Sequence, residues 1–200
     1  MTLAKALGLA VPDLSRLTIA GKPCLLIKRY DRMIDSAGTV QRIHQEDFCQ
    51  AMGYPPERKY QQEGGPLLRD CIAMIRSWSS APVLDIRDFL NAVIFNMLVG
   101  NADAHGKNYS LLYQNGSRRL APAYDIVCTL AWPELSKKPA MKIGQCDSID
   151  AITPAHWQKM TQEASLSWPP LRERLVSLCQ ALQAALPSQS LRLATGDDEM

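Results

Sequence analysis

The chain has 200 residues, a length that fits one domain or one lobe of a larger domain. With 46% hydrophobic and 21% charged residues it has the composition of a soluble globular protein, and no run of about 18 apolar residues could span a bilayer. A formal charge of +2 is too small an excess to indicate direct nucleic-acid binding, which needs clustered lysines and arginines.

Short apolar runs separated by chain breakers make up the first 53 residues. Met1 is not followed by the basic start and apolar stretch of a secretory signal, so we expect a cytoplasmic protein. Residues 3–9 predict a short helix, and residues 17–20 and 23–27 predict two strands joined by a tight turn. Residues 45–52 predict a helix that Gly53 ends.

The middle of the chain is expected to be mainly helical. Residues 67–78 follow a polar, glycine-rich loop and predict a helix. Apolar residues between Ile86 and Leu98 recur at helical spacing, which predicts a second helix ending at Gly100. Residues 109–113 and 118–121 flank an Asn-Gly pair, whose positive φ angles are typical of a tight hairpin.

Two further helices are predicted near the carboxyl end. Thr153 is a suitable cap for a helix beginning at Pro154, and leucines from Leu171 to Leu186 repeat at helical spacing until Pro187 stops them. Residues 188–200 are expected to form a polar tail. The six cysteines are spread singly, so we expect buried, reduced thiols rather than disulfides or a zinc site.

The polar loop from Gly100 to Asn108 separates the long apolar helix from the Asn-Gly hairpin, and Tyr124 and Asp125 follow that hairpin. An antiparallel hairpin brings its beginning and end together, so Asn108 and Asp125 should lie side by side. Mg²⁺ prefers carboxylate and amide oxygens and takes its remaining ligands from water and phosphates. The pair therefore predicts a magnesium site.

Asp103 precedes Asn108 by five residues, which is the spacing of a protein-kinase catalytic loop. In such a loop the aspartate accepts the proton of the attacking hydroxyl, while the asparagine and a later aspartate hold the metal. We therefore predict Asp103 as the catalytic base and Asn108 and Asp125 as metal ligands. Lys107, and with less support His105, would neutralise charge on the transferred group.

Residues 101–108 and 123–126 resemble the catalytic and metal-binding motifs of HipA-family toxin kinases. Other segments resemble this family in the same order, up to about Trp157: residues 28–32 its nucleotide-binding hinge, residues 45–50, 59–60 and 64–66 the stretches before the catalytic loop, and residues 140–144 the strand beyond the metal site.

This resemblance implies an α+β, mainly helical fold, the carboxy-terminal lobe of a HipA-like kinase related to the phosphatidylinositol kinases, with two short β-hairpins. Residues 1–32 would end the amino-terminal lobe and hinge, and residues 33–187 would form the catalytic lobe. ATP would be the co-substrate, with Mg²⁺. The implied ATP-binding residues are Lys28, Arg29, Tyr30, Asp31, His105, Lys107 and Tyr124.

The resemblance also implies transfer of the ATP γ-phosphoryl group to a serine or threonine of a protein, notably an aminoacyl-tRNA synthetase, and pairing with a DNA-binding antitoxin. The family's phosphate-covering loop, with its autophosphorylated serine, and its ATP-binding lysine strand have no counterpart in this sequence. We therefore expect activity to need a missing or separately encoded amino-terminal part. Lys28 also departs from the family, which commonly has an acidic residue there.

Plainer interpretations of these residues stay open. Asp103, Asn108 and Asp125 could be turn formers, His105 a loop histidine and Lys107 a solvated charge. Tyr30 could be a core aromatic, and Asp31 could pair with Arg29 or Arg32. At the level of function, the alternatives are a catalytically inactive remnant or binding module that holds an antitoxin or other protein and, more distantly, a metal-dependent hydrolase.

Overall fold

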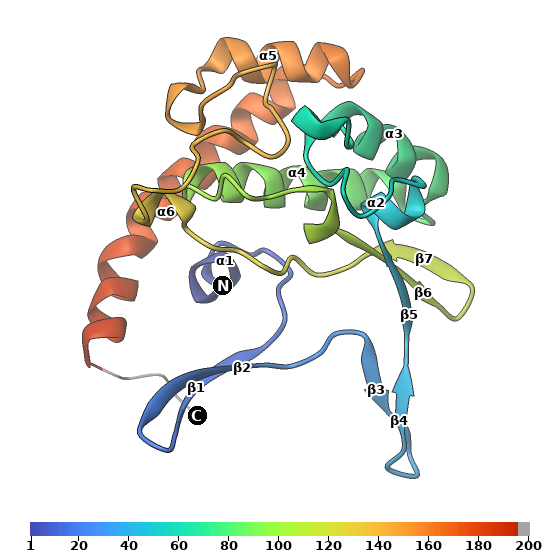
Figure 1. The fold of residues 1–200 in the computed structure, drawn as a ribbon, viewed down its shortest axis with the longest axis vertical. Helices are drawn as coiled ribbons and strands as arrows, with labels where there is room; N and C mark the ends of the chain where they lie inside the picture. Colours follow the sequence, from blue (N-terminus) through green and yellow to red (C-terminus); the bar gives the residue numbers. More distant parts are fainter. Residues whose placement is uncertain (196–200) are drawn as a thin grey trace.

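The computed structural model describes residues 1–195, so the part of the predicted tail at 196–200 lies outside the described residues. A helical body forms one end of the molecule and two β-hairpins project from the other (Figure 1). The elements run in the order α1 (Thr2–Ala6), β1 (Leu14–Ile19), β2 (Lys22–Ile27), β3 (Arg32–Ile34), β4 (Val40–Arg42), β5 (His44–Asp47), α2 (Phe48–Ala51), α3 (Leu68–Trp78), α4 (Pro82–Leu98), β6 (Ser110–Gln114), β7 (Ser117–Leu120), α5 (Pro154–Glu163) and α6 (Trp168–Thr195).

Helix α4 lies at the centre of the body and contacts α3, α6 and β7. Phe89 and the four residues from Ala92 to Phe95 are almost completely buried, as expected for a helix with neighbours on several sides. Phe89 packs against Phe48 and Tyr109, with ring centroids 5.5 and 4.9 Å away. Because Tyr109 directly precedes β6, this aromatic cluster fixes the start of the hairpin to the core.

The predicted α+β, mainly helical fold with hairpins at residues 17–29 and between Asn108 and Asp125 is confirmed. The β6–β7 hairpin belongs to a three-stranded antiparallel sheet, in which β5 pairs with β6. The sequence did not predict β5, nor the small β3–β4 hairpin. All strand pairs are antiparallel.

The predicted helix over residues 45–52 is wrong at its start. Residues His44–Asp47 extend along β6, and the helix begins only at Phe48. The Asp47 carboxylate accepts a hydrogen bond of 2.9 Å from the Gln50 N–H, and the Gln50 side chain accepts one from the Asp47 N–H. Pairing with a distant strand thus overrides the local helical preference, and Asp47 serves as the cap.

The predicted stop at Pro187 is also wrong, because α6 continues through Pro187 to Thr195. Proline lacks an N–H group and removes one helical hydrogen bond, which can bend a helix without ending it. Residues 188–195 are therefore helical and do not form a separate tail.

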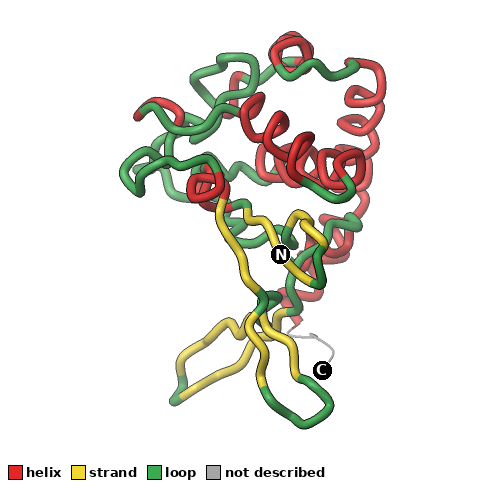
Figure 2. The backbone as a smooth tube through the Cα atoms, turned by 90° about the vertical axis from the view of Figure 1, so that its right-hand side faces the viewer, coloured by secondary structure: helices red, strands yellow, loops and turns green. Residues whose placement is uncertain are grey.

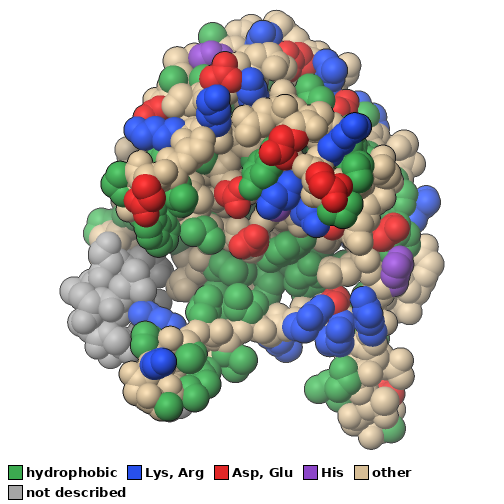
Figure 3. All heavy atoms as spheres, viewed as in Figure 1, with side chains coloured by type: hydrophobic (Ala, Val, Ile, Leu, Met, Phe, Trp, Pro, Cys, Tyr) green, Lys and Arg blue, Asp and Glu red, His purple; other side chains and the backbone are tan. Residues whose placement is uncertain are grey.

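The β1–β2 and β3–β4 hairpins extend away from the helical body (Figure 2). They expose large apolar side chains, including Ile19 at 58%, Leu26 at 57% and Ile34 at 74% of their full exposure. Apolar side chains also line the underside of the body between the two hairpins (Figure 3). Exposed apolar side chains in this number are typical of a contact region for further protein structure.

All six cysteines are free thiols, but the prediction that they are buried is confirmed only for Cys49, Cys71 and Cys146, whereas Cys128 is exposed. None of the helices described between residues 1 and 195 is both long and apolar enough to cross a membrane.

Candidate functional site

Asn108 and Asp125 are in direct contact at the base of the β6–β7 hairpin. The one-turn helix Gly106–Asn108 delivers Asn108 just before β6, and its side-chain amide donates a hydrogen bond to the Asp125 carboxylate. The Asn108 side-chain oxygen accepts a hydrogen bond of 3.1 Å from the His105 N–H. The predicted convergence of the two side chains is confirmed, and their role as metal ligands stays a prediction.

Asn101 connects the loop that carries Asp103 and Asn108 to the loop that carries Asp125. It is buried, and its side-chain amide donates to the Asp125 carbonyl at 3.4 Å and to the Asn96 side-chain oxygen at 2.9 Å. Asp125 itself has a φ of 54°, in the left-handed region that non-glycine residues rarely adopt. The partly buried hydrogen bond from Asn101 to the Asp125 carbonyl supports this rare backbone conformation, while Asp125 itself is exposed.

The hydrogen bonds that hold Asn101 extend through Asn96 to the hydrophobic core. Asn96 donates a hydrogen bond of 3.2 Å to the Tyr109 hydroxyl, which belongs to the aromatic cluster. We assigned no role to Asn96 or Asn101 from the sequence. The available signal was Asn96 itself, an amide among the apolar residues of the last two turns of α4, since buried amides require partners.

Asp103 lies on the same loop but is exposed to solvent. One of its carboxylate oxygens accepts a hydrogen bond of 2.8 Å from the Tyr60 hydroxyl, and its N–H donates to the Asn101 side-chain oxygen at 3.2 Å. Tyr60 is 43 residues distant in sequence, and its contact with Asp103 was not predicted. Burial raises the pKa of Tyr60, and its hydrogen bond to Asp103 raises it further.

His105 is buried beneath the Tyr60 ring, with the two ring centroids 5.3 Å apart. Its Nδ1 atom is buried and has no hydrogen-bond partner in the described part of the chain. Burial lowers the pKa of His105, and the nearby Lys59 lowers it further. The ring is therefore neutral near pH 7, which disfavours the suggested charge-neutralising role and leaves a polar atom without a partner.

The hinge-like segment reaches the site through one aromatic contact. Tyr30 stacks on Tyr124, with ring centroids 5.6 Å apart. The Tyr124 hydroxyl donates to the Lys107 carbonyl at 2.8 Å and shares a hydrogen bond of 2.6 Å with the Ser110 hydroxyl. Three of the predicted ATP-binding residues are thus brought together beside Asn108.

The other hinge residues are placed differently. Lys28 is exposed, whereas Asp31 is buried to 2% exposure and accepts hydrogen bonds from both Arg29 and Arg32. Hydrogen bonding from Arg29 is the main reason why the pKa of Asp31 falls to about 2. The open alternative of an ion pair for Asp31 is therefore confirmed, while its contact with nucleotide stays a prediction.

Three hollows surround the two loops. Asp103 borders one of about 350 Å³ together with Tyr60 and residues 135, 136 and 138–140. Asp125 borders another of about 320 Å³, lined by β1, β2 and residues 125–127. Among residues 1–195 there is no cluster of three or more His, Cys, Asp or Glu side chains that could hold a metal ion, so a metal here would depend on Asn108 with Asp125.

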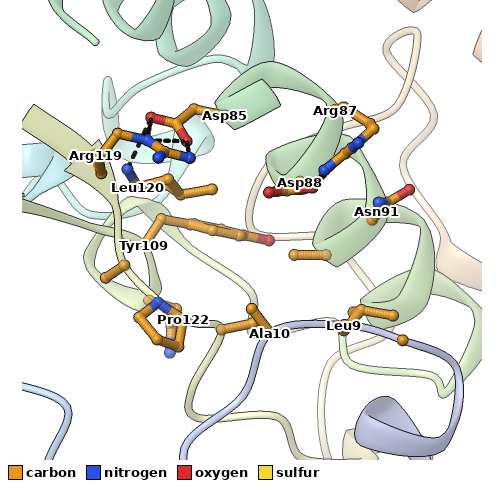
Figure 4. A pocket seen from close by; sticks show the side chains of 15 residues that line it. Leu9, Ala10, Asp85, Arg87, Asp88, Asn91, Tyr109, Arg119, Leu120 and Pro122 are labelled. Carbon is orange, nitrogen blue, oxygen red and sulfur yellow. Dashed lines mark hydrogen bonds and ion pairs between the residues drawn. The ribbon is translucent and has the colours of Figure 1, made fainter. Parts of the chain in front are cut away.

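The third hollow, of about 350 Å³, lies between α4, β7 and the end of α1 (Figure 4). Its buried Asp85 accepts hydrogen bonds from Ser79, from the Arg119 guanidinium and from the Leu120 N–H. These donors satisfy both oxygens of the carboxylate. The pair of Asp85 and Arg119 is therefore an anchor that joins the β6–β7 hairpin to α4.

Comparison with known proteins agrees with this arrangement. Residues 1–186 match the family described as the HipA-like C-terminal domain. Over 186 residues, 93% of this chain and 44% of the other, the chain is 45% identical to "Putative kinase Y4mE" of Sinorhizobium fredii. It is 34% identical over 154 residues to the serine/threonine-protein kinase toxin HipA of Shewanella oneidensis, which covers 72% of this chain and 36% of that protein.

The solved structure of HipA with HipB and operator DNA from Shewanella oneidensis MR-1 is also similar. It has a TM-score of 0.90 at 26% identity, covering 96% of this chain and 47% of that chain. The chain therefore spans less than half the length of these relatives.

Proposed function

The chain belongs to the family of HipA-like C-terminal domains, and on this premise we propose that it carries the base and metal-binding residues of a serine/threonine protein kinase. The observation that supports this most is the convergence of Asn108 with Asp125, next to a loop whose Asp103 is exposed and oriented by Tyr60. Phosphoryl transfer requires a base and metal ligands in this mutual arrangement.

In the proposed reaction, the oxygen of a serine or threonine hydroxyl forms a bond to the γ-phosphorus of ATP. The bond from that phosphorus to the bridging oxygen breaks, and ADP leaves with the electron pair. The hydroxyl proton passes to the Asp103 carboxylate. Tyr60 holds one carboxylate oxygen, and the other has no hydrogen bond within the described chain, so it is available for the incoming proton.

The residues present fit a magnesium ion and a nucleotide. Asn108 and Asp125 bring an amide and a carboxylate together. Mg²⁺ would take the Asp125 carboxylate and the Asn108 side-chain oxygen, which here also accepts the His105 N–H, with phosphates and water completing the ligand shell. When bound, Mg²⁺ would neutralise charge on the phosphates. His105, whose buried Nδ1 has no partner among the described residues, belongs to the proposed ATP-binding set. Tyr30, Lys107 and Tyr124 complete the proposed ATP-binding set beside Asn108, with Lys28, Arg29 and Asp31 on the adjoining segment.

We further propose that activity needs amino-terminal structure, supplied by a longer chain or by a separate subunit. Relatives are more than twice as long as the matched region, and the exposed apolar side chains of the two hairpins would suit such structure. ATP bound from one side would keep mobile phosphates, and the reaction depends chiefly on their positioning.

The proposal of partners for this chain is based on its relatives. The similar HipA structure contains HipB and operator DNA, so a DNA-binding antitoxin is the proposed partner. The proposed substrate is a protein, with an aminoacyl-tRNA synthetase as the candidate that the family suggests. The exposed hairpins also favour one second candidate, a binding module without catalysis that holds such a partner.

One experiment separates the two candidates. The chain, and a chimera in which the amino-terminal part of the Sinorhizobium fredii relative precedes it, are titrated with a fluorescent ATP analogue with and without Mg²⁺. The same proteins are tested for transfer of labelled γ-phosphate to protein. We expect weak binding by the chain alone and magnesium-dependent binding and transfer by the chimera. A chimera that binds nucleotide but never transfers phosphate would favour the binding module.

A further inference from the structure

The hollow beside Asp103 is lined by different residues from the other two hollows. It is formed by Tyr60, Gln62 and Asp103 on one side and by residues 135, 136 and 138–140 on the other, and we call it the acceptor groove. Neither Asn108 nor Asp125 borders it: Asn108 lines the hollow between α4 and β7, and Asp125 lines the hollow beside β1 and β2.

Both walls of the acceptor groove are fixed to the catalytic loop. The Ala140 N–H donates to the Ala102 carbonyl at 2.8 Å, and the Gln61 N–H donates to the Ala140 carbonyl at 2.9 Å. The Thr129 hydroxyl donates to the Gly100 carbonyl at 3.0 Å and accepts from the Ala102 N–H. A molecule held by these walls is consequently held at a defined position relative to Asp103.

The outer wall combines an apolar and a basic side chain. Leu135 is 47% exposed, although it borders the groove. Lys138 also borders the groove and forms no ion pair within residues 1–195, although the Asp147 carboxylate lies close enough to respond to its charge. The neighbouring lysines differ, because Lys137 pairs with Asp150 and Lys142 pairs with Asp147.

We propose that the acceptor groove binds an extended segment of the protein substrate and selects an acidic residue close to the acceptor hydroxyl. This inference rests on the proposed function, since a hydroxyl that gives its proton to Asp103 must come within hydrogen-bond distance of it. The segment that carries this hydroxyl then occupies the groove. Leu135 contacts an apolar side chain of the segment, and Lys138 attracts an acidic one.

The test uses the full chain and three synthetic peptides with a central serine, identical except that the flanking positions carry Glu, Gln or Lys. Backbone amide NMR shifts report binding without ATP. We expect the Glu peptide to shift the signals of residues 135–140 and to bind about two- to fivefold more tightly than the Lys peptide, in line with one solvent-exposed charge pair.

Charge reversal provides the control. Lys138→Glu should reverse the order of the two charged peptides, Lys138→Arg should keep it, and Lys137→Glu, an equal charge change at the adjacent residue, should leave it unchanged. Equal binding of all three peptides, shifts elsewhere on the chain, no shifts with any peptide, or an equal effect of the two Glu substitutions would overturn the proposal.

A parallel assay in the chimera keeps the two proposals distinguishable. Phosphate transfer to all three peptides without preference would contradict the acceptor groove and leave the kinase standing. Charge-selective binding at the groove, in a chimera that transfers no phosphate to any peptide or protein, would contradict the kinase function.

Discussion

Asp103 and Asp125 lie on neighbouring loops, yet their contacts predict different effects on the reaction. Asp103 contacts Tyr60 and the acceptor groove, whereas Asp125 contacts Asn108. In the chimera, Asp103→Ala should lower turnover at least about 100-fold and largely spare nucleotide affinity, because it removes the base. Asp125→Ala should also weaken the magnesium-dependent part of that affinity. Titration of both variants with the ATP analogue checks this, and full activity of Asp103→Ala would show that the base is misassigned.

The contact of Tyr60 with Asp103 can be tested in the isolated chain. A negative carboxylate next to a phenol disfavours the tyrosinate, which is one reason why the pKa of Tyr60 is raised. Asp103→Asn should therefore lower the pKa of Tyr60, but not to its ordinary value, because burial remains the larger cause. NMR titration of the tyrosine ring carbons measures this pKa, with Asp125→Asn as the control. An unchanged pKa in Asp103→Asn would contradict the contact.

At the scale of elements, the β6–β7 hairpin determines the site because it joins the Asn108 loop to the Asp125 loop. Asp85 on α4 holds the hairpin through Arg119 and Leu120 (Figure 4). Asp85→Ala should lower the free energy of unfolding by about 2–4 kcal/mol, because it leaves a guanidinium and a buried N–H without their acceptor. Asp88→Ala, which removes an exposed pair with Arg87 on the same helix, should cost less than about 1 kcal/mol. Urea unfolding of both variants measures these changes, and equal losses of unfolding free energy in Asp85→Ala and Asp88→Ala would contradict the anchor role of Asp85.

At the scale of the whole molecule, the exposed apolar hairpins predict where further structure attaches. Leu26→Lys should change the free energy of unfolding of the isolated chain by less than about 0.5 kcal/mol, because the side chain is exposed. In the chimera the same change should weaken magnesium-dependent nucleotide binding, because it disturbs the attachment. Val83→Lys on α4, where the side chain is 81% exposed, is the control. Equal nucleotide affinity in both variants would show that the β1–β2 hairpin is not the attachment surface.

The sequence by itself determined the parts of this protein that depend on local chemistry. The apolar stripe of α4 and the Asn-Gly turn between β6 and β7 follow from periodicity and turn preference within a few residues. The convergence of Asn108 with Asp125 follows directly from that hairpin. The resemblance of the two loop motifs was also sufficient to indicate the family.

Only the tertiary structure decided which residues distant in sequence support the site. The pairing of β5 with β6, the bond from Tyr60 to Asp103 and the anchor from Asp85 to Arg119 join segments that are more than thirty residues apart. The burial that lowers the pKa of His105 also comes from such packing. Local propensities act over a few neighbouring residues, whereas these contacts depend on how whole elements pack, so no pattern in the chain could specify them in advance.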